Sequence, residues 1–205
     1  MAKSRKAIDD LVAAGMDLIA ENGWRNFSLV DLARKTDTDL AEVHRQLPRR
    51  RAVLSGVGRH LDKAMLEKAL PGLDDLDIRE RLFDLMMRRF EAMQTFRPGL
   101  VRLARDARKS PDLVLLTFCN LDRMASALAD AAGIRLRGMA GRAARRMLML
   151  AYAQAFRVWL HDDSEDMAAT MAEVDKRLGH LDRMAGLACR LRRRRNPTPE
   201  AAETA

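Results

Sequence analysis

The sequence predicts an all-α protein, and three observations support this prediction. Leu, Ala, Met and Arg, which are good helix formers, dominate the composition, whereas aromatic residues make up only 4% of it. Apolar residues recur at three- and four-residue intervals, and the period-two alternation of a half-buried strand is almost absent. The chain has 205 residues, 48% of them hydrophobic, which is enough to bury a sizeable core. We therefore expect about nine helices, arranged as an amino-terminal head and a carboxy-terminal bundle.

The first 70 residues are expected to form the head, with a helix-turn-helix inside it. Apolar spacing predicts the first helix, and Asn22-Gly23 supplies the left-handed stop that ends it. Two short helices around a tight turn follow, and Pro48 ends the second of them. The four helices predicted in this part of the chain span residues 5–22, 28–35, 39–47 and 49–70.

Both short helices begin with the pattern of a capping box, in which a polar residue is followed three positions later by an acid. Ser28 and Asp31 form this pattern in the first short helix, and Asp39 and Glu42 form it in the second. In such a pair the first side chain accepts an early backbone N–H, while the acid reaches back to the start of the helix. The pattern therefore indicates where both helices begin.

Residues 71–77 are predicted to be a linker, because Pro71-Gly72 precedes an acidic run there. Long amphipathic segments follow, so residues 78–190 are expected to form a helical bundle. Arg97-Pro98-Gly99 is expected to break the first long helix, and Ser164 is expected to cap the last one. The predicted helices span residues 78–96, 100–109, 111–132, 139–161 and 165–190.

The charge of the chain permits nucleic acid or an anionic lipid surface as a partner, since the net charge is +8. The first 70 residues hold 13 basic and 10 acidic residues, which leaves a net charge of only +3. Any DNA contact in the head must therefore come from a few well-placed arginines. Residues 191–205 begin with a basic run and are expected to end in a disordered tail, because that segment has few apolar residues.

Neither a membrane protein nor an enzyme is indicated. No apolar run approaches the roughly 18 residues of a membrane span, and the first residues lack the apolar core of a secretory signal, so we expect a cytoplasmic protein. No nucleophile, base and orienting group can be assembled from the scattered histidines and acids, and no cofactor is expected. Cys119 and Cys189 have no metal-ligand spacing near them, and both are expected to pack between helices.

Residues 37–53 resemble the signature of the TetR/AcrR family of repressors, which reads G-V-S-x-G-T-L-Y-x-H-F-x-S-K-x-x-L. The two align without a gap: Asp37 stands at the turn glycine, His44 at the tyrosine, Leu47 at the phenylalanine and Arg50 at the lysine. An aspartate can adopt the left-handed turn, and an arginine can hold a phosphate as the lysine does. The resemblance implies a helix-turn-helix that binds a double-stranded DNA operator.

Two positions of the third helix depart from that signature, where Ala41 and Glu42 replace a glycine and a threonine. A carboxylate at the second position repels phosphate, but Arg45 lies one turn later and can mask it with an ion pair. His44 is either a phosphate donor, if it is exposed, or a packing residue, if it is buried. The residues expected to contact DNA are Ser28, His44, Arg45, Arg49 and Arg50. The alternative to DNA binding is that the apolar residues only pack a three-helix unit and that the arginine run is a solvated helix start.

A second resemblance lies in residues 145–178, which are similar to the carboxy-terminal helices of the Coq-nine ubiquinone-biosynthesis accessory family. The residues that match are Trp159-Leu160, Asp162-Asp163-Ser164, Thr170, Asp175 and Arg177. This resemblance implies a TetR-like fold that binds lipid, with a helix-turn-helix that no longer reads DNA. From the residues alone, the acids after His161 are a helix start, and a metal site at His161, Asp162 and Asp163 is the weaker alternative.

The bundle is predicted to hold an apolar small molecule or a lipid, and to form a homodimer. Methionine and phenylalanine side chains give adaptable apolar surface, although plain core packing is the alternative. The residues expected to line the ligand pocket are Met86, Phe90, Met93, Phe118 and Met147. The long apolar segments 139–161 and 165–190 are expected to pair across a two-fold axis as a four-helix interface.

Overall fold

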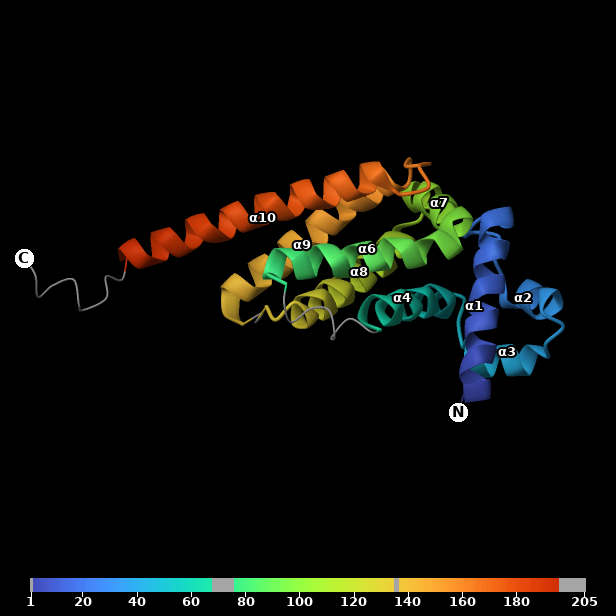
Figure 1. Ribbon diagram of the computed structural model, residues 1–205. Helices are drawn as coiled ribbons and strands as arrows, with labels where there is room; N and C mark the ends of the chain where they lie inside the picture. The colour runs from blue at the N-terminus through green and yellow to red at the C-terminus, as the bar shows by residue number, and fades with distance from the viewer. Residues whose placement is uncertain (1, 68–75, 135–136, 196–205) are drawn as a thin grey trace, which may run out of the picture.

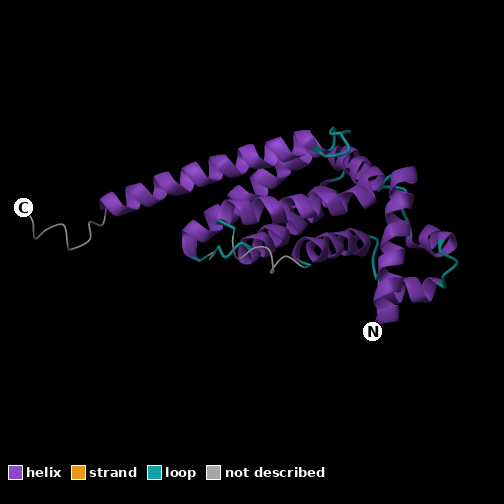
Figure 2. Ribbon diagram, viewed as in Figure 1, coloured by secondary structure: helices purple, strands orange, loops and turns teal. Residues whose placement is uncertain are grey.

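The computed structural model describes residues 2–67, 76–134 and 137–195, and it describes side chains from residue 8 to residue 186 within these ranges. Every regular element in the described ranges is a helix, which confirms the all-α prediction (Figure 2). The helices are α1 (Ala2–Asn22), α2 (Leu29–Lys35), α3 (Leu40–Gln46), α4 (Arg51–Leu66), α6 (Ile78–Met93), α7 (Arg97–Asp106), α8 (Pro111–Ala131), α9 (Gly138–Trp159) and α10 (Ala168–Arg195), with short 3-10 turns η1 (Gln94–Phe96) and η2 (Ala107–Lys109).

The head and the bundle lie at opposite ends of the molecule (Figure 1). Helix α2 packs against α1, α3 packs against α2, and α4 leads from the head toward the bundle of α6, α8, α9 and α10. Helix α7 packs along α1 and joins the two parts from the other side. The carboxy-terminal part of α10 extends past the other helices (Figure 1).

The end of α1 is the predicted left-handed stop. Gly23 has a φ of +80°, and its N–H donates to the Ile19 carbonyl at 2.9 Å. Few residues other than glycine adopt this conformation without strain. The chain therefore turns sharply here, and the side chain of the next residue, Trp24, is fully buried.

The first long helix ends ahead of Arg97-Pro98-Gly99, as predicted, because α6 stops at Met93 and η1 follows it. The next helix begins earlier than predicted, since α7 starts at Arg97 rather than at residue 100. Pro98 lies in the first turn of α7, where its missing N–H costs no hydrogen bond. Gly99 is buried against α1, and a Cβ on it would lie 2.7 Å from the Met16 carbonyl oxygen. A glycine therefore stands here because the two helices approach each other closely.

Several predicted helix boundaries differ from the structure, and the largest differences are at the ends of α4 and α10. Helix α4 ends at Leu66 rather than at residue 70. Helix α10 begins at Ala168, whose N–H donates to the Ser164 hydroxyl at 3.1 Å, and it runs to Arg195. The basic run expected in a tail after the last helix is therefore part of α10. Residues 68–75, which include most of the predicted linker, and the expected disordered segment 196–205 lie outside the described residues.

The buried carboxylate of Asp162 ties the end of α9 to the start of α10. It accepts hydrogen bonds from the backbone N–H and the hydroxyl of Thr170, both at 2.7 Å, and from the hydroxyl of Ser164. Burial alone would raise the pKa of Asp162, but these hydrogen bonds outweigh burial and lower it to about 2. The residues after His161 thus form a helix start, and the described residues hold no group of three potential metal ligands.

We expect the stability contributed by Asp162 to be lost in acid. Its folded pKa is about 2 and its ordinary value is 3.8, so the contribution is complete above about pH 4 and disappears as the pH falls toward 2. The shift corresponds to about 2 kcal/mol. Urea unfolding should show Asp162→Asn less stable than the wild type by about this amount at pH 7, with the difference closing below about pH 3.

The neighbouring substitution Asp163→Asn is the control, because that side chain is 92% exposed. It should cost less than about 0.5 kcal/mol at any pH. A difference between Asp162→Asn and wild type that persists unchanged at about pH 2 would contradict this account of Asp162.

A largely buried network of polar side chains joins α4 to three helices of the bundle. Arg89 of α6 is only 4% exposed, and it donates to the hydroxyl of Tyr152 in α9 at 3.1 Å and to the carboxylate of Asp62 in α4. Arg123 of α8 donates to the other oxygen of Asp62 at 3.0 Å. Burial raises the pKa of the Tyr152 hydroxyl, which stays protonated and donates to the Met93 sulfur at 3.0 Å. Asp62 is therefore the shared anion between two arginines.

Replacing Asp62 with asparagine should destabilise the protein strongly, because it leaves the Arg89 guanidinium buried without a counter-charge. We expect a loss of about 3 kcal/mol in the free energy of unfolding, measured with urea. Asp122→Asn is the matched control, since it breaks the half-exposed Asp122–Arg145 pair at 3.2 Å and should cost less than about 0.5 kcal/mol. If the two variants lose the same free energy of unfolding, burial of the network does not increase the contribution of Asp62 to stability.

Candidate nucleic-acid interface

The turn between α2 and α3 has the predicted left-handed residue. Asp37 has a φ of +46°, and the N–H of Thr38 donates to the Ala33 carbonyl at 3.0 Å, which closes the end of α2. The Thr38 hydroxyl donates to the Thr36 carbonyl at 3.1 Å and braces the same turn. Helices α2 and α3 are therefore held as a compact helix-turn-helix.

The two predicted capping boxes are formed only in part. Ser28 caps α2 by accepting the Asp31 N–H at 3.1 Å, but the Asp31 carboxylate accepts the Ser28 hydroxyl proton at 2.6 Å instead of a backbone N–H. Asp39 makes no side-chain cap on α3, and Glu42 points along the helix to Arg45 and Gln46. The prediction for Asp39 and Glu42 is wrong, because side chains one turn ahead compete for the acid.

Helix α3 buries one face and presents the other to solvent. Val43 and Leu47 are fully buried in the head, whereas Ala41, His44 and Arg45 are exposed. The exposed face therefore combines a small residue with two groups that can donate hydrogen bonds. Exposure of His44 favours the donor interpretation of that residue.

Glu42 is neutralised within the helix, as the sequence predicts. Its carboxylate accepts hydrogen bonds from Gln46 and from the guanidinium of Arg45. The bond from Gln46 and then the charge of Arg45 lower the pKa of Glu42, so the acid stays ionised and paired. A phosphate approaching α3 therefore meets an ion pair rather than an isolated carboxylate.

Arg50 is shared between the head and the bundle. Its guanidinium lies over the Trp24 ring, 4.7 Å from the ring centroid, and 3.5 Å from the carboxylate of Asp112 at the start of α8. Asp112 also accepts the indole N–H of Trp24 at 3.2 Å, and that hydrogen bond lowers the pKa of Asp112. Arg49 is exposed beside this cluster, and no side-chain hydrogen bond or ion pair holds it within the described residues.

Sequence reasoning missed Trp24 and Asp112 as partners of Arg50. Gly23-Trp24 marks the end of the first helix in the sequence, but nothing in the chain signals that residue 112 would meet it. Only the tertiary fold brings Arg50 and Asp112 together, because 62 residues separate them along the chain.

Three of the residues predicted to line a ligand pocket are buried on α6, and the other two are at least partly exposed on other helices. Met86, Phe90 and Met93 are buried on α6, and the Phe90 ring stacks on Tyr152 with 5.0 Å between centroids. Met147 is half-buried on α9, and Phe118 is 58% exposed on α8.

The expectation that Cys119 packs between helices is wrong, because Cys119 is exposed. It follows Phe118 on the part of α8 where Val114 and Leu115 are exposed as well. The side chain of Cys189 lies outside the described residues.

The indole N–H of Trp159 is buried without a hydrogen-bond acceptor among the described residues. The ring lies in the bundle core, 6.4 Å from Phe90 and 5.7 Å from Phe156 between centroids. Arg97 covers its other side, with the guanidinium 4.8 Å from the ring. An unpaired donor in an apolar interior costs free energy, and an acceptor on a bound molecule would recover it.

Several solved structures of TetR-family regulators share this arrangement of helices. The TetR transcriptional regulator from Nitrosomonas europaea ATCC 19718 superposes with a TM-score of 0.70 and 22% identity over 87% of this chain and 98% of that chain. A putative TetR-family regulator from Rhodococcus sp. gives 0.58 and 16% over 86% and 97%, respectively. The TetR-family regulator PfmR from Thermus thermophilus gives 0.52 and 19% over 82% and 96%. The chain therefore has the fold of TetR-family transcriptional regulators.

The family model COQ9 matches residues 117–185, from α8 to α10, and so encloses the segment in which the sequence resembles that family. The matching motif residues hold α9 and α10 in place: Asp162 bonds to Thr170, and Asp175 pairs with Arg79 of α6 at 2.7 Å. A search of curated proteins gave no match. No helix in the described residues is long and apolar enough to cross a membrane.

Proposed function

We propose that this protein is a transcriptional regulator that binds a double-stranded DNA operator as a homodimer. The observation that carries the proposal is the exposed face of α3, where Arg45 already pairs with Glu42, together with the exposed Arg49 and Arg50 that follow the helix. Such a face can neutralise phosphates, and its small Ala41 leaves room for the DNA backbone to approach. His44 adds a hydrogen-bond donor on the exposed face of α3, and Ser28, whose hydroxyl donates to Asp31, lies at the start of α2 and would have to exchange that bond to contact a phosphate.

In this proposal an apolar small molecule or lipid in the bundle controls the spacing of the two heads. Recognition helices must reach successive major grooves, which are about 34–36 Å apart. A ligand that prefers another head spacing shifts the population away from the DNA-binding state. Met86, Phe90 and Met93 are adaptable walls for such a ligand, and the unpaired N–H of Trp159 offers it a hydrogen bond.

We expect Arg49→Ala and Arg50→Ala to weaken binding by a similar factor on every DNA sequence, because phosphate contacts carry no base information. Each should reduce the slope of log affinity against log salt by about one for each lost contact in each half-site. Glu42→Thr should tighten binding at low salt, since it removes an acid, adds a hydroxyl and frees Arg45. Labelled DNA from the promoter region of the protein's own gene, titrated across a salt series, measures all three.

Arg105→Ala removes the same charge from an exposed position on α7 and should leave the salt slope unchanged. Thermal unfolding of Arg50→Ala separates a loss of DNA contact from a loss of the Trp24 and Asp112 contacts. If the wild type shows no salt-dependent binding and Glu42→Thr does not create it, the DNA-binding proposal fails.

A second function is favoured by the COQ9 match over residues 117–185. Under it the protein is a lipid-binding accessory protein whose bundle takes an isoprenoid or acyl chain, and the helix-turn-helix does not bind DNA. Native mass spectrometry of the purified protein would then show an apolar molecule bound, while the DNA titration shows no salt-dependent binding.

We also expect a homodimer in solution, formed by α9 and α10 packing against the same helices of a second copy. The outer face of α9 carries Met139 and Leu150, which are 80% and 61% exposed. Apolar side chains on a bundle surface gain stability when a second copy covers them. Analytical ultracentrifugation at micromolar concentration should give the mass of two chains.

Leu150→Glu should shift this equilibrium toward the monomer, because it would bury a charge in the interface. Leu66→Glu is the control, as that side chain is 41% exposed at the end of α4, outside the predicted interface. A wild-type protein that sediments as a monomer at micromolar concentration contradicts the dimer and weakens the DNA-binding proposal.

A further inference from the structure

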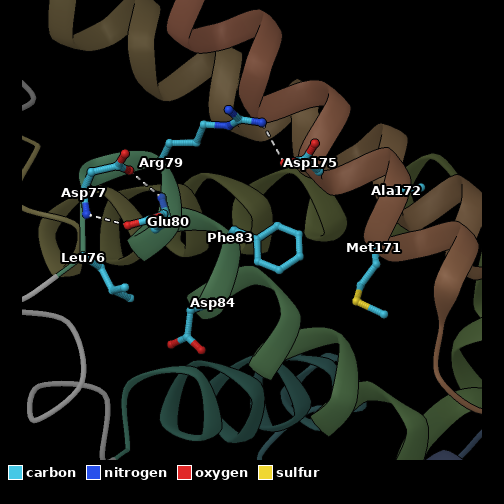
Figure 3. A pocket seen from close by; sticks show the side chains of 9 residues that line it. All are labelled: Leu76, Asp77, Arg79, Glu80, Phe83, Asp84, Met171, Ala172 and Asp175. Atoms are coloured by element: carbon cyan, nitrogen blue, oxygen red, sulfur yellow. Dashed lines mark hydrogen bonds and ion pairs between the residues drawn. The ribbon is translucent and has the colours of Figure 1, made fainter.

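An open groove of about 650 Å³ lies between the first two turns of α6 and the first two turns of α10 (Figure 3). Apolar side chains from both helices and the preceding loop form part of its lining, and acidic side chains form most of the rest. The lining residues central to its chemistry are Leu76, Asp77, Glu80, Phe83, Met171 and Asp175. None of the lining residues belongs to the head or to the predicted core pocket around Phe90, so the groove is a separate feature of the bundle.

The charge inside the groove is opposite to that of the whole chain. Its lining holds the carboxylates of Asp77, Glu80, Asp84 and Asp175 and the single guanidinium of Arg79, whereas the chain has a net charge of +8. Two of the acids are already paired, Asp84 with Arg88 at 2.7 Å and Asp175 with Arg79 at 2.7 Å. Because Arg79 is already in an ion pair with Asp175, none of these lining residues offers an anionic ligand an unpaired positive charge.

Asp77 and Glu80 differ from the other acids because they hold each other through the backbone. Asp77 accepts the Glu80 N–H at 2.8 Å, and Glu80 accepts the Asp77 N–H at 3.0 Å, which completes a capping box at the start of α6. The capping box fixes both side chains at the edge of the groove. Their partners in these hydrogen bonds are neutral backbone groups, and neither carboxylate forms an ion pair within the described residues, so a cation in the groove can approach both.

The apolar part of the groove lies directly beside these acids. Figure 3 shows the Phe83 ring between the acidic edge, formed by Asp77 and Glu80, and Met171 on the facing helix α10. An aromatic face attracts a cation, and a thioether adapts to an apolar body of varied shape. A neutral apolar molecule would gain the same apolar contact without using the two charges.

We propose that this groove binds an organic cation with an apolar body, such as an alkylammonium compound. Phe83 and Met171 contact the apolar body, and Asp77 and Glu80 neutralise the charge. The site is distinct from the core pocket of the proposed regulator, and binding at it requires neither DNA nor an operator.

Isothermal titration calorimetry on the full chain, without DNA, tests this site with three probes of equal chain length. Octyltrimethylammonium should bind saturably, one per chain, and about tenfold more tightly than octanol, while octanoate should not bind. Raising the salt concentration should weaken only the cation, because its binding depends on charge.

The double variant Asp77→Asn with Glu80→Gln removes both charges, and its amide oxygens can still accept the capping hydrogen bonds. It should bind octyltrimethylammonium about tenfold more weakly and octanol unchanged. Phe83→Leu should weaken both probes, and it keeps enough apolar volume to fold. Glu91→Gln is the matched control, because Glu91 is exposed on the same helix outside the groove.

Equal binding of octanol and octyltrimethylammonium would overturn the proposal, and so would full affinity in the double variant. Sedimentation of the double variant tests another occupant, the arginine run at the end of α10 from a second copy. If the double variant sediments with a different mass from the wild type, and the wild type binds no cation, the groove holds the arginine run of a second copy instead of an organic cation. Failure of DNA binding would leave the cation measurements unaffected, so the two proposals can fail separately.

Discussion

The carboxylate of Asp62 fixes the position of α4 against the bundle, because it must satisfy Arg89 from α6 and Arg123 from α8 together. A shift of α4 by half a turn would leave the buried Arg89 without its counter-charge, at a cost of several kcal/mol. Gly58, one turn earlier on α4, leaves room for this arrangement, since a Cβ there would lie 2.5 Å from the Arg123 guanidinium. The register of α4, and with it the placement of the head, is therefore set by charge as well as by apolar packing.

A second polar junction joins the head to the bundle around Trp24. The Trp24 backbone N–H donates to Asp106 at 2.7 Å, and its indole N–H donates to Asp112 at 3.2 Å. Arg50 covers the ring and faces the same Asp112 carboxylate. A phosphate that draws Arg50 outward thus competes with an acid of the bundle, so that the two ends of the molecule share one charged side chain.

Local sequence patterns predicted most of the helices, because apolar periodicity, Gly23 and Asp37 act over a few residues. These patterns were ambiguous where one residue is compatible with two local structures. Pro98 is an example, because a proline can either end a helix or stand in its first turn. The partners of Arg50 and Arg89 could not be predicted, since Asp112 lies 62 residues from Arg50 and Asp62 lies 27 residues from Arg89 along the chain. The same limit applies to Phe118, whose apolar character is compatible with the core and with the surface alike.

The close contact between α1 and α7 also couples the head to the bundle. Gly99 brings the α7 backbone against the Met16 carbonyl, and Trp24 and Arg25 bond to residues at and after the end of α7. Packing and hydrogen bonds thus hold α7 against the head. The short connections η1 (Gln94–Phe96) and Ser110 join this helix to α6 and α8, so a shift in the bundle can be passed to the head through α7 as well as through α4.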